Sequence, residues 1–144
     1  MEIVAMTAQH IAALAALERA CFSDPWSEQG LSEELDNPHA VFRVAVEGDT
    51  VLGYVGMHHL LDEGYITNVA VSPDARRRGV ARALLADLTA YGTANGLYRI
   101  TLEVRLGNTP AITLYEGAGY TRDGVRPGFY RDPTEDAAIY SLYF

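Results

Sequence analysis

The chain has 144 residues, of which 49% are hydrophobic and 21% charged, values typical of one globular domain rather than of a disordered or two-domain chain. Eleven basic and nineteen acidic residues give a net charge of −8, which disfavours nucleic-acid binding and favours a basic partner or simply a well-solvated surface. No apolar run approaches the roughly 20 residues of a membrane helix, and the first residues lack the basic region of a secretion signal. We therefore expect a cytoplasmic enzyme or binding protein that does not contact membranes, with a monomer favoured.

Few residues could bind a metal ion. Cys21 is the only cysteine, so a cysteine cluster and an internal disulfide are both excluded. The four histidines are scattered or adjacent, as His58 and His59 are, and none has the spacing of a zinc motif. We therefore expect no metal. Cys21 falls on the apolar stripe of the first predicted helix, which favours a place in the core over a role as a covalent acyl carrier.

The first third of the chain predicts one strand and two helices. Residues 2–6 alternate weakly between apolar and polar and indicate a short strand. Within residues 8–21, apolar side chains recur every three and four positions, which predicts an amphipathic helix that Thr7 can cap. Ser27 is a suitable N-cap for a second helix over residues 28–35, which the following Asn-Pro pair ends.

The middle of the chain predicts three strands and a long helix. Residues 41–46 and 51–61 are rich in β-branched side chains, and the polar turn between them indicates a hairpin. A second turn at Asp62–Gly64 leads into a strand over residues 65–71. A helix then begins at Val80 and ends at an Asn-Gly pair.

The last third predicts a strand, a short helix and a final strand pair. Residues 98–104 alternate in the manner of a strand, and residues 110–118 form the helix. Strands over residues 120–125 and 137–142 enclose a polar loop at residues 131–136. The complete order β-α-α-β-β-β-α-β-α-β-β predicts an α/β fold in which helices cover a mixed sheet.

The strongest functional signal lies between Ile66 and Leu85. Here a strand passes through a turn into the sequence Arg-Arg-Arg-Gly-Val-Ala at residues 76–81, where a helix begins. A helix N-terminus presents unpaired backbone N–H groups and a partial positive charge, and the small residues Gly79 and Ala81 would let a pyrophosphate approach closely. The sequence is neither a Walker A loop nor a dinucleotide-binding glycine motif. Phosphate binding and an ordinary polar helix start are both open on these residues alone.

Glu103 is the most unusual polar residue in a predicted strand. It lies in residues 98–104, on the face that also carries Thr101. A carboxylate inside a covered strand is unfavourable unless it is paired or opens onto a cleft. It could therefore form a salt bridge with Arg99 or Arg105, or it could accept a proton in catalysis, directly or through water.

Two residues near the short last helix also carry possible chemistry. Tyr115 falls on the apolar stripe of that helix, which is consistent with a core aromatic whose hydroxyl lies at the edge. A phenol of pKa about 10 can also protonate a departing thiolate. Asn108 stands just before Thr109, the predicted cap, and Pro110; loop polarity explains this asparagine as well as ligand binding does.

Taken together, these segments resemble the GNAT superfamily of acetyl-CoA-dependent N-acetyltransferases over residues 1–144. Arg76 to Ala81 matches the superfamily's Q/R-x-x-G-x-G/A loop, with alanine in place of the commoner final glycine. Asn108 to Tyr120 matches its asparagine, tyrosine and terminal glycine-aromatic pattern. Short sequence motifs also resemble those of the bacterial ribosomal-protein alanine N-acetyltransferases, a family within this superfamily: Pro25-Trp26-Ser27, Asn68-Val69-Ala70-Val71, Leu102-Glu103-Val104-Arg105, Leu114-Tyr115-Glu116 and Glu135-Asp136-Ala137.

The resemblance implies a single GNAT domain with about seven mostly antiparallel strands, a splayed parallel central pair and about four helices. It implies acetyl-CoA as the donor, bound between the strands at 65–71 and 98–104, with no metal. Glu103 would be the general base and Tyr115 the general acid of a direct transfer, and a strand N–H would stabilise the oxyanion. The residues that the resemblance assigns to the cofactor are Val69, Ala70, Val71, Arg76, Arg77, Arg78, Gly79, Val80, Ala81, Arg82 and Asn108.

For the acceptor, the resemblance implies the N-terminal α-amine of a protein, specifically the N-terminal alanine of a basic small-subunit ribosomal protein. Trp26 and Tyr130 are the candidate substrate-binding residues, although Trp26 could equally be a half-buried anchor between helices. At neutral pH about one tenth of an α-amine of pKa about 8 is unprotonated, whereas less than about one thousandth of a lysine of pKa about 10.4 is unprotonated. A lysine side chain, a small-molecule amine, or a non-catalytic acetyl-CoA-binding module are the open alternatives.

Overall fold

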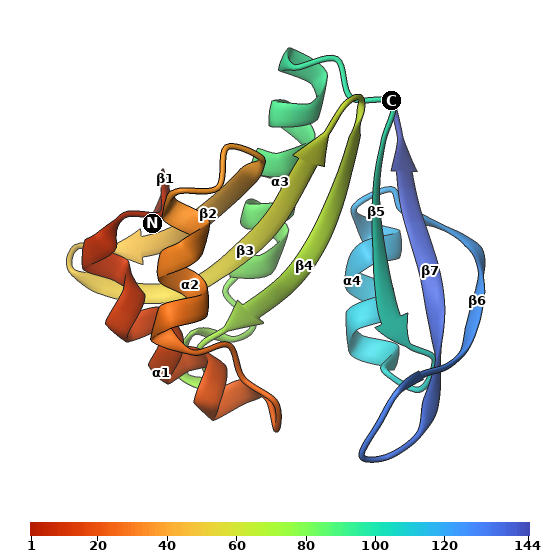
Figure 1. Ribbon diagram of the computed structural model, residues 1–144, viewed down its shortest axis with the longest axis horizontal. Coiled ribbons are helices and arrows are strands. Elements are labelled where there is room, and N and C mark those ends of the chain that lie inside the picture. The colour runs from red at the N-terminus through yellow and green to blue at the C-terminus, as the bar shows by residue number, and fades with distance from the viewer.

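One seven-stranded sheet connects both halves of the protein in the computed structural model, which describes residues 1–144 (Figure 1). Its strands follow the order β1-β2-β3-β4-β5-β7-β6. The strands are β1 (Glu2–Ala5), β2 (Ala40–Glu47), β3 (Thr50–Leu60), β4 (Glu63–Val71), β5 (Arg99–Arg105), β6 (Thr121–Tyr130) and β7 (Glu135–Tyr143). The helices are α1 (Ile11–Cys21), α2 (Glu28–Leu35), α3 (Val80–Ala94) and α4 (Thr109–Gly117), with short 3₁₀ turns η1 (Ala8–His10) and η2 (Pro73–Ala75).

The centre of the sheet is a parallel pair that separates along its length. β4 and β5 pair only from Glu63 opposite Arg99 to Tyr65 opposite Thr101, and every other strand pair is antiparallel. Beyond Tyr65 the two strands diverge, so the molecule opens as a V between β4 and β5 (Figure 1). This arrangement, with four α-helices around one mixed sheet, confirms the predicted α/β fold class.

Two apolar clusters hold the helices on the sheet. The larger contains 19 buried residues and joins α3 and α4 to the strands, with Leu84, Leu85 and Leu88 of α3 fully buried. The smaller contains nine and joins α1 and α2 to β2, β3 and β4. The structure therefore confirms what the helical periodicity predicts, because each apolar stripe covers one part of the sheet. The predicted N-cap of α2 is also present, since Ser27 Oγ accepts a hydrogen bond from Gly30 N at 3.0 Å. No helix is long and apolar enough to cross a membrane.

Two predicted turns are shorter in the structure. The turn placed at Asp62–Gly64 falls on Leu61 and Asp62, because Glu63 already pairs with both Leu60 and Arg99. The loop placed at 131–136 covers only residues 131–134, since Glu135 pairs with Tyr130. β6 is an edge strand, where Pro127 is tolerated; it reaches Tyr130, five residues beyond the strand predicted over residues 120–125.

Candidate active site

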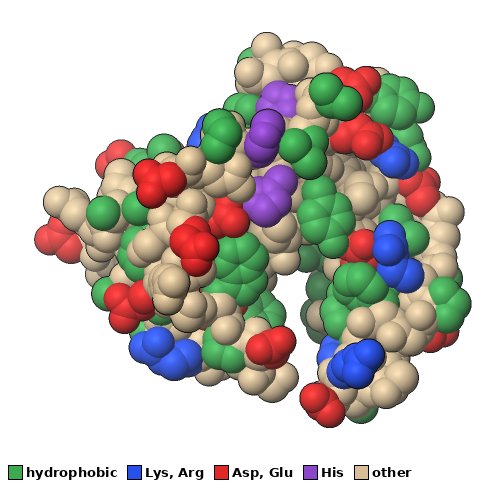
Figure 2. All heavy atoms as spheres, viewed as in Figure 1, with side chains coloured by type: hydrophobic (Ala, Val, Ile, Leu, Met, Phe, Trp, Pro, Cys, Tyr) green, Lys and Arg blue, Asp and Glu red, His purple; other side chains and the backbone are tan.

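A cleft of about 780 Å³ lies at the wide end of the V. It is formed by the end of β4, the turn before α3, the start of α3, the start of α4 and the end of α1. Figure 2 shows the hollow between the two halves of the molecule into which it opens. Sixteen residues line the cleft: Cys21, Phe22, Val69, Ala70, Val71, Ala75, Arg76, Arg77, Gly79, Val80, Ala81, Arg82, Asn108, Pro110, Ala111 and Leu114. Ten of the eleven residues predicted for the cofactor are among them.

The cleft contains the open N-terminus of α3. Gly79 is its N-cap, with φ of +76° and no side-chain cap, so the first N–H groups of the helix have no capping partner. A positive φ is accessible to glycine at little cost. The preceding Arg77 also has a positive φ of 65°, a conformation that costs a non-glycine residue free energy. The backbone is therefore shaped to leave these N–H groups free, and with the helix dipole they favour an anion.

The arginines of this turn do not all face the cleft. Arg76, Arg77 and Arg82 line it. Arg78 does not: its Nη2 lies 2.7 Å from Glu47 Oε2 at the end of β2. This ion pair holds the guanidinium toward the neighbouring strand, and the assignment of Arg78 to the cofactor stays a prediction.

On the opposite wall, Asn108 both lines the cleft and begins α4. Its Oδ1 accepts a hydrogen bond from Ala111 N at 3.2 Å, which makes Asn108 the N-cap and Thr109 the first helical residue. The prediction of Thr109 as the cap was therefore wrong by one residue. The side-chain oxygen of Asn108 is the one that reaches the free N–H groups of the first turn.

Glu103 lies outside the cleft, just beyond the last paired position of β4 and β5. Its side chain is only 6% exposed. Tyr65 donates a hydrogen bond to Oε2, and Arg126 Nη2 lies 3.3 Å from Oε1. The arginines suggested by the sequence are engaged elsewhere, Arg99 with Glu63 and Arg105 with Glu135.

Tyr65 and Arg126 are the contacts of Glu103 that sequence reasoning missed. Tyr65 opposes Thr101, two residues before Glu103, so a correct parallel register would have indicated it. Arg126 reaches Glu103 from β6, which is separated from β5 by β7. Nothing in the local sequence signals that contact.

Three phenols, those of Tyr65, Tyr115 and Tyr130, stay neutral well above physiological pH. Burial, with a smaller effect of Tyr130, raises the pKa of Tyr115 to about 12. Burial and then the charge of Glu103 raise the pKa of Tyr130 to about 12. Burial and the hydrogen bond to Glu103 raise the pKa of Tyr65 well above its usual value. Each can therefore donate a hydrogen bond or a proton at neutral pH.

The two predicted acceptor residues come from segments on either side of the hollow (Figure 1). Trp26 lies between α1 and α2, with its ring centroid 6.0 Å from that of Phe42. Its backbone N–H donates to Oε1 of the buried Glu18 at 3.0 Å. Tyr130 ends β6, beside Phe129. Both side chains are partly exposed, so each can contribute to a wall of the hollow.

The structure contains no group of three or more His, Cys, Asp or Glu side chains that could hold a metal ion.

Comparison with known proteins agrees with this geometry. Residues 11–120 match the family described as Acetyltransferase (GNAT) family. The sequence is 33% identical to the [ribosomal protein bS18]-alanine N-acetyltransferase of Escherichia coli K12 over 128 residues, which covers 88% of this chain and 86% of that protein. It is 33% identical to N-alpha-acetyltransferase RimI of Mycobacterium tuberculosis over 141 residues, or 94% and 87% of the two chains. The crystal structure of the Escherichia coli ribosomal-protein-S18-alanine N-acetyltransferase superposes with a TM-score of 0.91 at 29% identity, covering 99% and 92%.

Proposed function

This chain belongs to the GNAT acetyltransferase family and is an acyltransferase, and we propose that it moves an acetyl group from acetyl-CoA to the N-terminal α-amine of a protein. The observation that carries the proposal is the V between β4 and β5. Its wide end holds a cleft lined by arginines and by the N-terminus of α3, and a buried carboxylate lies at its narrow end.

The donor fits the cleft in charge and shape. Arg76, Arg77 and Arg82 surround the free N-terminus of α3, where they would hold the pyrophosphate of coenzyme A through charge-assisted hydrogen bonds. The apolar residues of β4 that line the cleft, Val69 and Val71, would lie along the pantetheine arm. When bound there, acetyl-CoA supplies the activated acetyl group as a thioester.

Free backbone at the end of β4 supports the placement of the thioester. Past Tyr65, β4 has no hydrogen-bonded partner on the side of β5. The edge N–H groups near Val69 to Val71 are therefore available to stabilise the oxyanion that forms as the amine attacks.

Glu103 would take the proton from the attacking amine, directly or through water. As the nitrogen bonds to the acetyl carbon and the carbon–sulfur bond breaks, the ammonium proton moves to Glu103. Tyr65 and Arg126 hold one carboxylate oxygen each, which fixes the carboxylate in place.

Tyr115 would donate the proton that the leaving sulfur requires. It follows Leu114, a cleft residue, on α4, and its buried phenol stays protonated at neutral pH. The phenol needs to be acidic only as charge develops on the sulfur.

The acceptor is proposed to be the N-terminal alanine of a basic ribosomal protein. The relatives from Escherichia coli and Mycobacterium tuberculosis are named for bS18 alanine and for N-alpha acetylation. The unprotonated fraction at neutral pH is far larger for an α-amine than for a lysine, so an α-amine requires less of Glu103. The net charge of −8 would also attract a basic partner.

A peptide panel tests the proposal. One peptide carries a free N-terminal alanine followed by arginines, a second is identical but N-terminally blocked, and a third is blocked and contains an internal lysine. We expect acetyl transfer from acetyl-CoA to the first peptide only, detected by thiol release and by mass. Equal rates on the blocked lysine peptide would overturn the N-terminal assignment, and binding of acetyl-CoA without transfer to any amine would indicate a non-catalytic module.

A further inference from the structure

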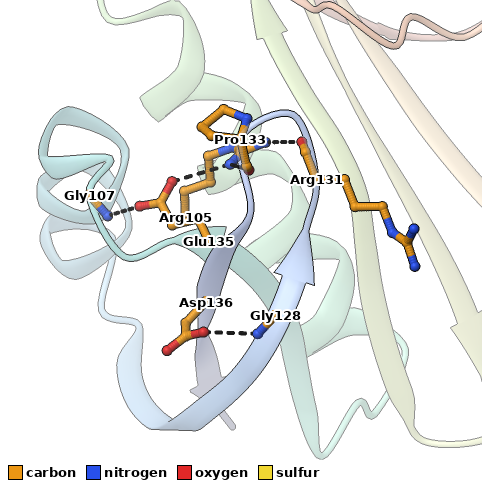
Figure 3. Close-up of polar contacts among 7 residues, drawn as sticks. All are labelled: Arg105, Gly107, Gly128, Arg131, Pro133, Glu135 and Asp136. Atoms are coloured by element: carbon orange, nitrogen blue, oxygen red, sulfur yellow. Dashed lines mark hydrogen bonds and ion pairs between the residues drawn. The ribbon is translucent and has the colours of Figure 1, made fainter.

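A polar cluster at the far end of β5 ties the last hairpin to the start of α4 (Figure 3). Arg105 Nη1 donates to the carbonyl oxygen of Pro133 at 2.9 Å, and Nη2 donates to that of Arg131 at 2.9 Å. Nη1 also lies 3.2 Å from Glu135 Oε1. One planar guanidinium thus engages two carbonyl groups of the short connection between β6 and β7 and the carboxylate of Glu135, the first residue of β7.

Glu135 extends this cluster to the cofactor side of the site. Its Oε2 accepts a hydrogen bond of 2.7 Å from the backbone N–H of Gly107. A Cβ atom at Gly107 would lie only 2.8 Å from that same oxygen, so a larger residue there would have to displace the Glu135 carboxylate. The next residue is Asn108, which caps α4 and lines the cleft. The Glu135 carboxylate therefore bridges the hairpin to a wall of the cofactor cleft.

A second carboxylate holds the irregular part of β6. The register with β7 shifts between Arg126 and Tyr130, which leaves extra residues on β6. Asp136 Oδ1 accepts a hydrogen bond of 2.8 Å from the N–H of Gly128, whose φ is +61°. The hairpin is thus fastened by side chains where its backbone ladder is interrupted.

We propose that Arg105, through Glu135, is a positioning residue that fixes the β6–β7 hairpin as the acceptor wall of the site. The Arg105 guanidinium carbon lies 4.5 Å from the ring centroid of Tyr130, a candidate residue for binding the acceptor substrate. Without the guanidinium, the carbonyl groups of Arg131 and Pro133 lose their donor and the Tyr130 ring loses its support. This role rests on the proposed function, since it assigns the hairpin to the acceptor and not to the donor.

The test compares variants of Arg105 and Glu135 with a control variant on β5. Arg105→Gln removes the positive charge and the planar guanidinium. Arg105→Lys keeps the charge without the guanidinium geometry. Glu135→Gln weakens the ion pair between Arg105 and Glu135. Arg99→Gln is the matched control, because Arg99 lies on the same face of β5, six residues earlier, and is paired with Glu63 at the opposite end. Each variant is assayed for the KM of the alanine peptide, the KM of acetyl-CoA and kcat.

We expect Arg105→Gln to raise the peptide KM about tenfold, with the acetyl-CoA KM within about twofold of wild type. Glu135→Gln should raise the peptide KM by a similar factor and the acetyl-CoA KM by less, because its bond to Gly107 adjoins the cleft residue Asn108. Arg105→Lys should recover part of the loss, and the double variant should cost less than the product of the single effects. Arg99→Gln should leave all three parameters unchanged. An unchanged peptide KM, or equal rises in both KM values, would overturn the proposal.

Limited trypsin cleavage supplies a readout that does not need activity. The carbonyl of Arg131 belongs to a bond that trypsin can cut, and Arg105 holds that carbonyl. We expect Arg105→Gln to speed cleavage after Arg131 several-fold, since local opening controls the rate, while Arg99→Gln does not. If wild type acetylates no peptide but this difference remains, the proposed function fails and the hairpin contact stands. If cleavage is unchanged, the positioning role fails.

Discussion

The hydroxyl of Tyr65 on β4 donates a hydrogen bond to Oε2 of Glu103 on β5. The contact lies directly beyond Tyr65 opposite Thr101, the last paired position of the two strands. It therefore joins the strands where they begin to diverge, and it places a buried carboxylate at the narrow end of the V. The position of Glu103 follows from the splay of the sheet, and its orientation follows from Tyr65 and Arg126.

This arrangement predicts distinct effects for the two residues. Glu103→Gln should lower kcat by about 10² to 10⁴, the usual contribution of a general base, with little change in the acetyl-CoA KM. Tyr65→Phe should lower kcat by about tenfold, because the carboxylate keeps its proton-accepting role but loses a group that orients it. Steady-state kinetics on the alanine peptide measure both. Tyr98→Phe is the control, since Tyr98 is exposed and packs on Tyr143; an unaltered kcat in Glu103→Gln would remove Glu103 from the mechanism.

The raised pKa of Tyr115 predicts how kcat depends on pH above neutrality. Because burial raises its pKa to about 12, the phenol should stay protonated and able to donate up to about pH 11. Ionisation of the general acid should therefore cause no fall in kcat between about pH 8 and pH 10. Tyr115→Phe should lower kcat across this range, whereas Tyr120→Phe, which alters the neighbouring ring 6.0 Å away, should not. A wild-type profile that falls with a midpoint near pH 9 and is flattened by Tyr115→Phe would contradict this assignment.

The elements and the donor side of the site follow from short-range signals in the sequence. Apolar periodicity places α1 and α3, and the turn from Arg76 to Ala81 predicts an anion site because helix ends have free N–H groups regardless of the rest of the fold. Glu103 is recognisable for a similar reason, since a carboxylate in a strand needs an explanation. These inferences depend on residues that are close together in the chain.

The acceptor side depends on contacts that no local pattern contains. Arg126 on β6 reaches Glu103 on β5 across the intervening strand β7. Glu135 and Asp136 have the composition of a loop, yet they form the start of β7 and fasten the hairpin through Gly107 and Gly128. The ion pair of Arg78 with Glu47 likewise joins segments far apart in the chain. Such pairings need the strand order and register, which charge and polarity alone do not determine.

The arginines of the turn before α3 predict a clear difference in donor affinity. Arg82→Gln removes a cleft guanidinium, so the acetyl-CoA KM should rise about tenfold and depend less steeply on salt. Arg78→Gln is the matched control: its guanidinium pairs with Glu47, and both side chains are about half exposed. Its effect on KM should be less than about twofold, as expected for a surface ion pair. Equal effects of the two substitutions would argue against the selective placement of these arginines.

Buried phenols also predict how stability depends on pH. Tyr115 and Tyr130 have pKa values of about 12 in the folded protein, against about 10 in the unfolded chain. The folded state thus favours the neutral phenols, and their contribution is fully present below about pH 10 and lost as the pH rises toward 12. Burial also raises the pKa of Tyr120, whose hydroxyl is buried without a partner. Urea unfolding should show falling stability above about pH 10, with a shallower fall in Tyr120→Phe and no loss of stability in that variant at neutral pH.

A buried network around Glu18 predicts the largest stability effect of a single hydroxyl. Glu18 is only 1% exposed, and its carboxylate accepts hydrogen bonds from Trp26 N at 3.0 Å and from Tyr54 Oη at 2.9 Å. Tyr54 Oη in turn accepts a hydrogen bond from Asn68 Nδ2, beside the register shift of β4. The network therefore links the segment that carries Trp26 to the strand that lines the cofactor cleft.

Tyr54→Phe removes the central hydroxyl of this network and leaves a buried carboxylate with one donor fewer. We expect the free energy of unfolding to fall by about 2 to 3 kcal/mol at neutral pH, since a hydrogen bond to a buried charge is worth more than a neutral one. Chemical denaturation measures the change, and Tyr98→Phe, an exposed phenol, should shift it by less than about 0.5 kcal/mol. A loss in Tyr54→Phe no larger than in Tyr98→Phe would mean that the Tyr54 hydroxyl does not stabilise the Glu18 carboxylate in the folded protein.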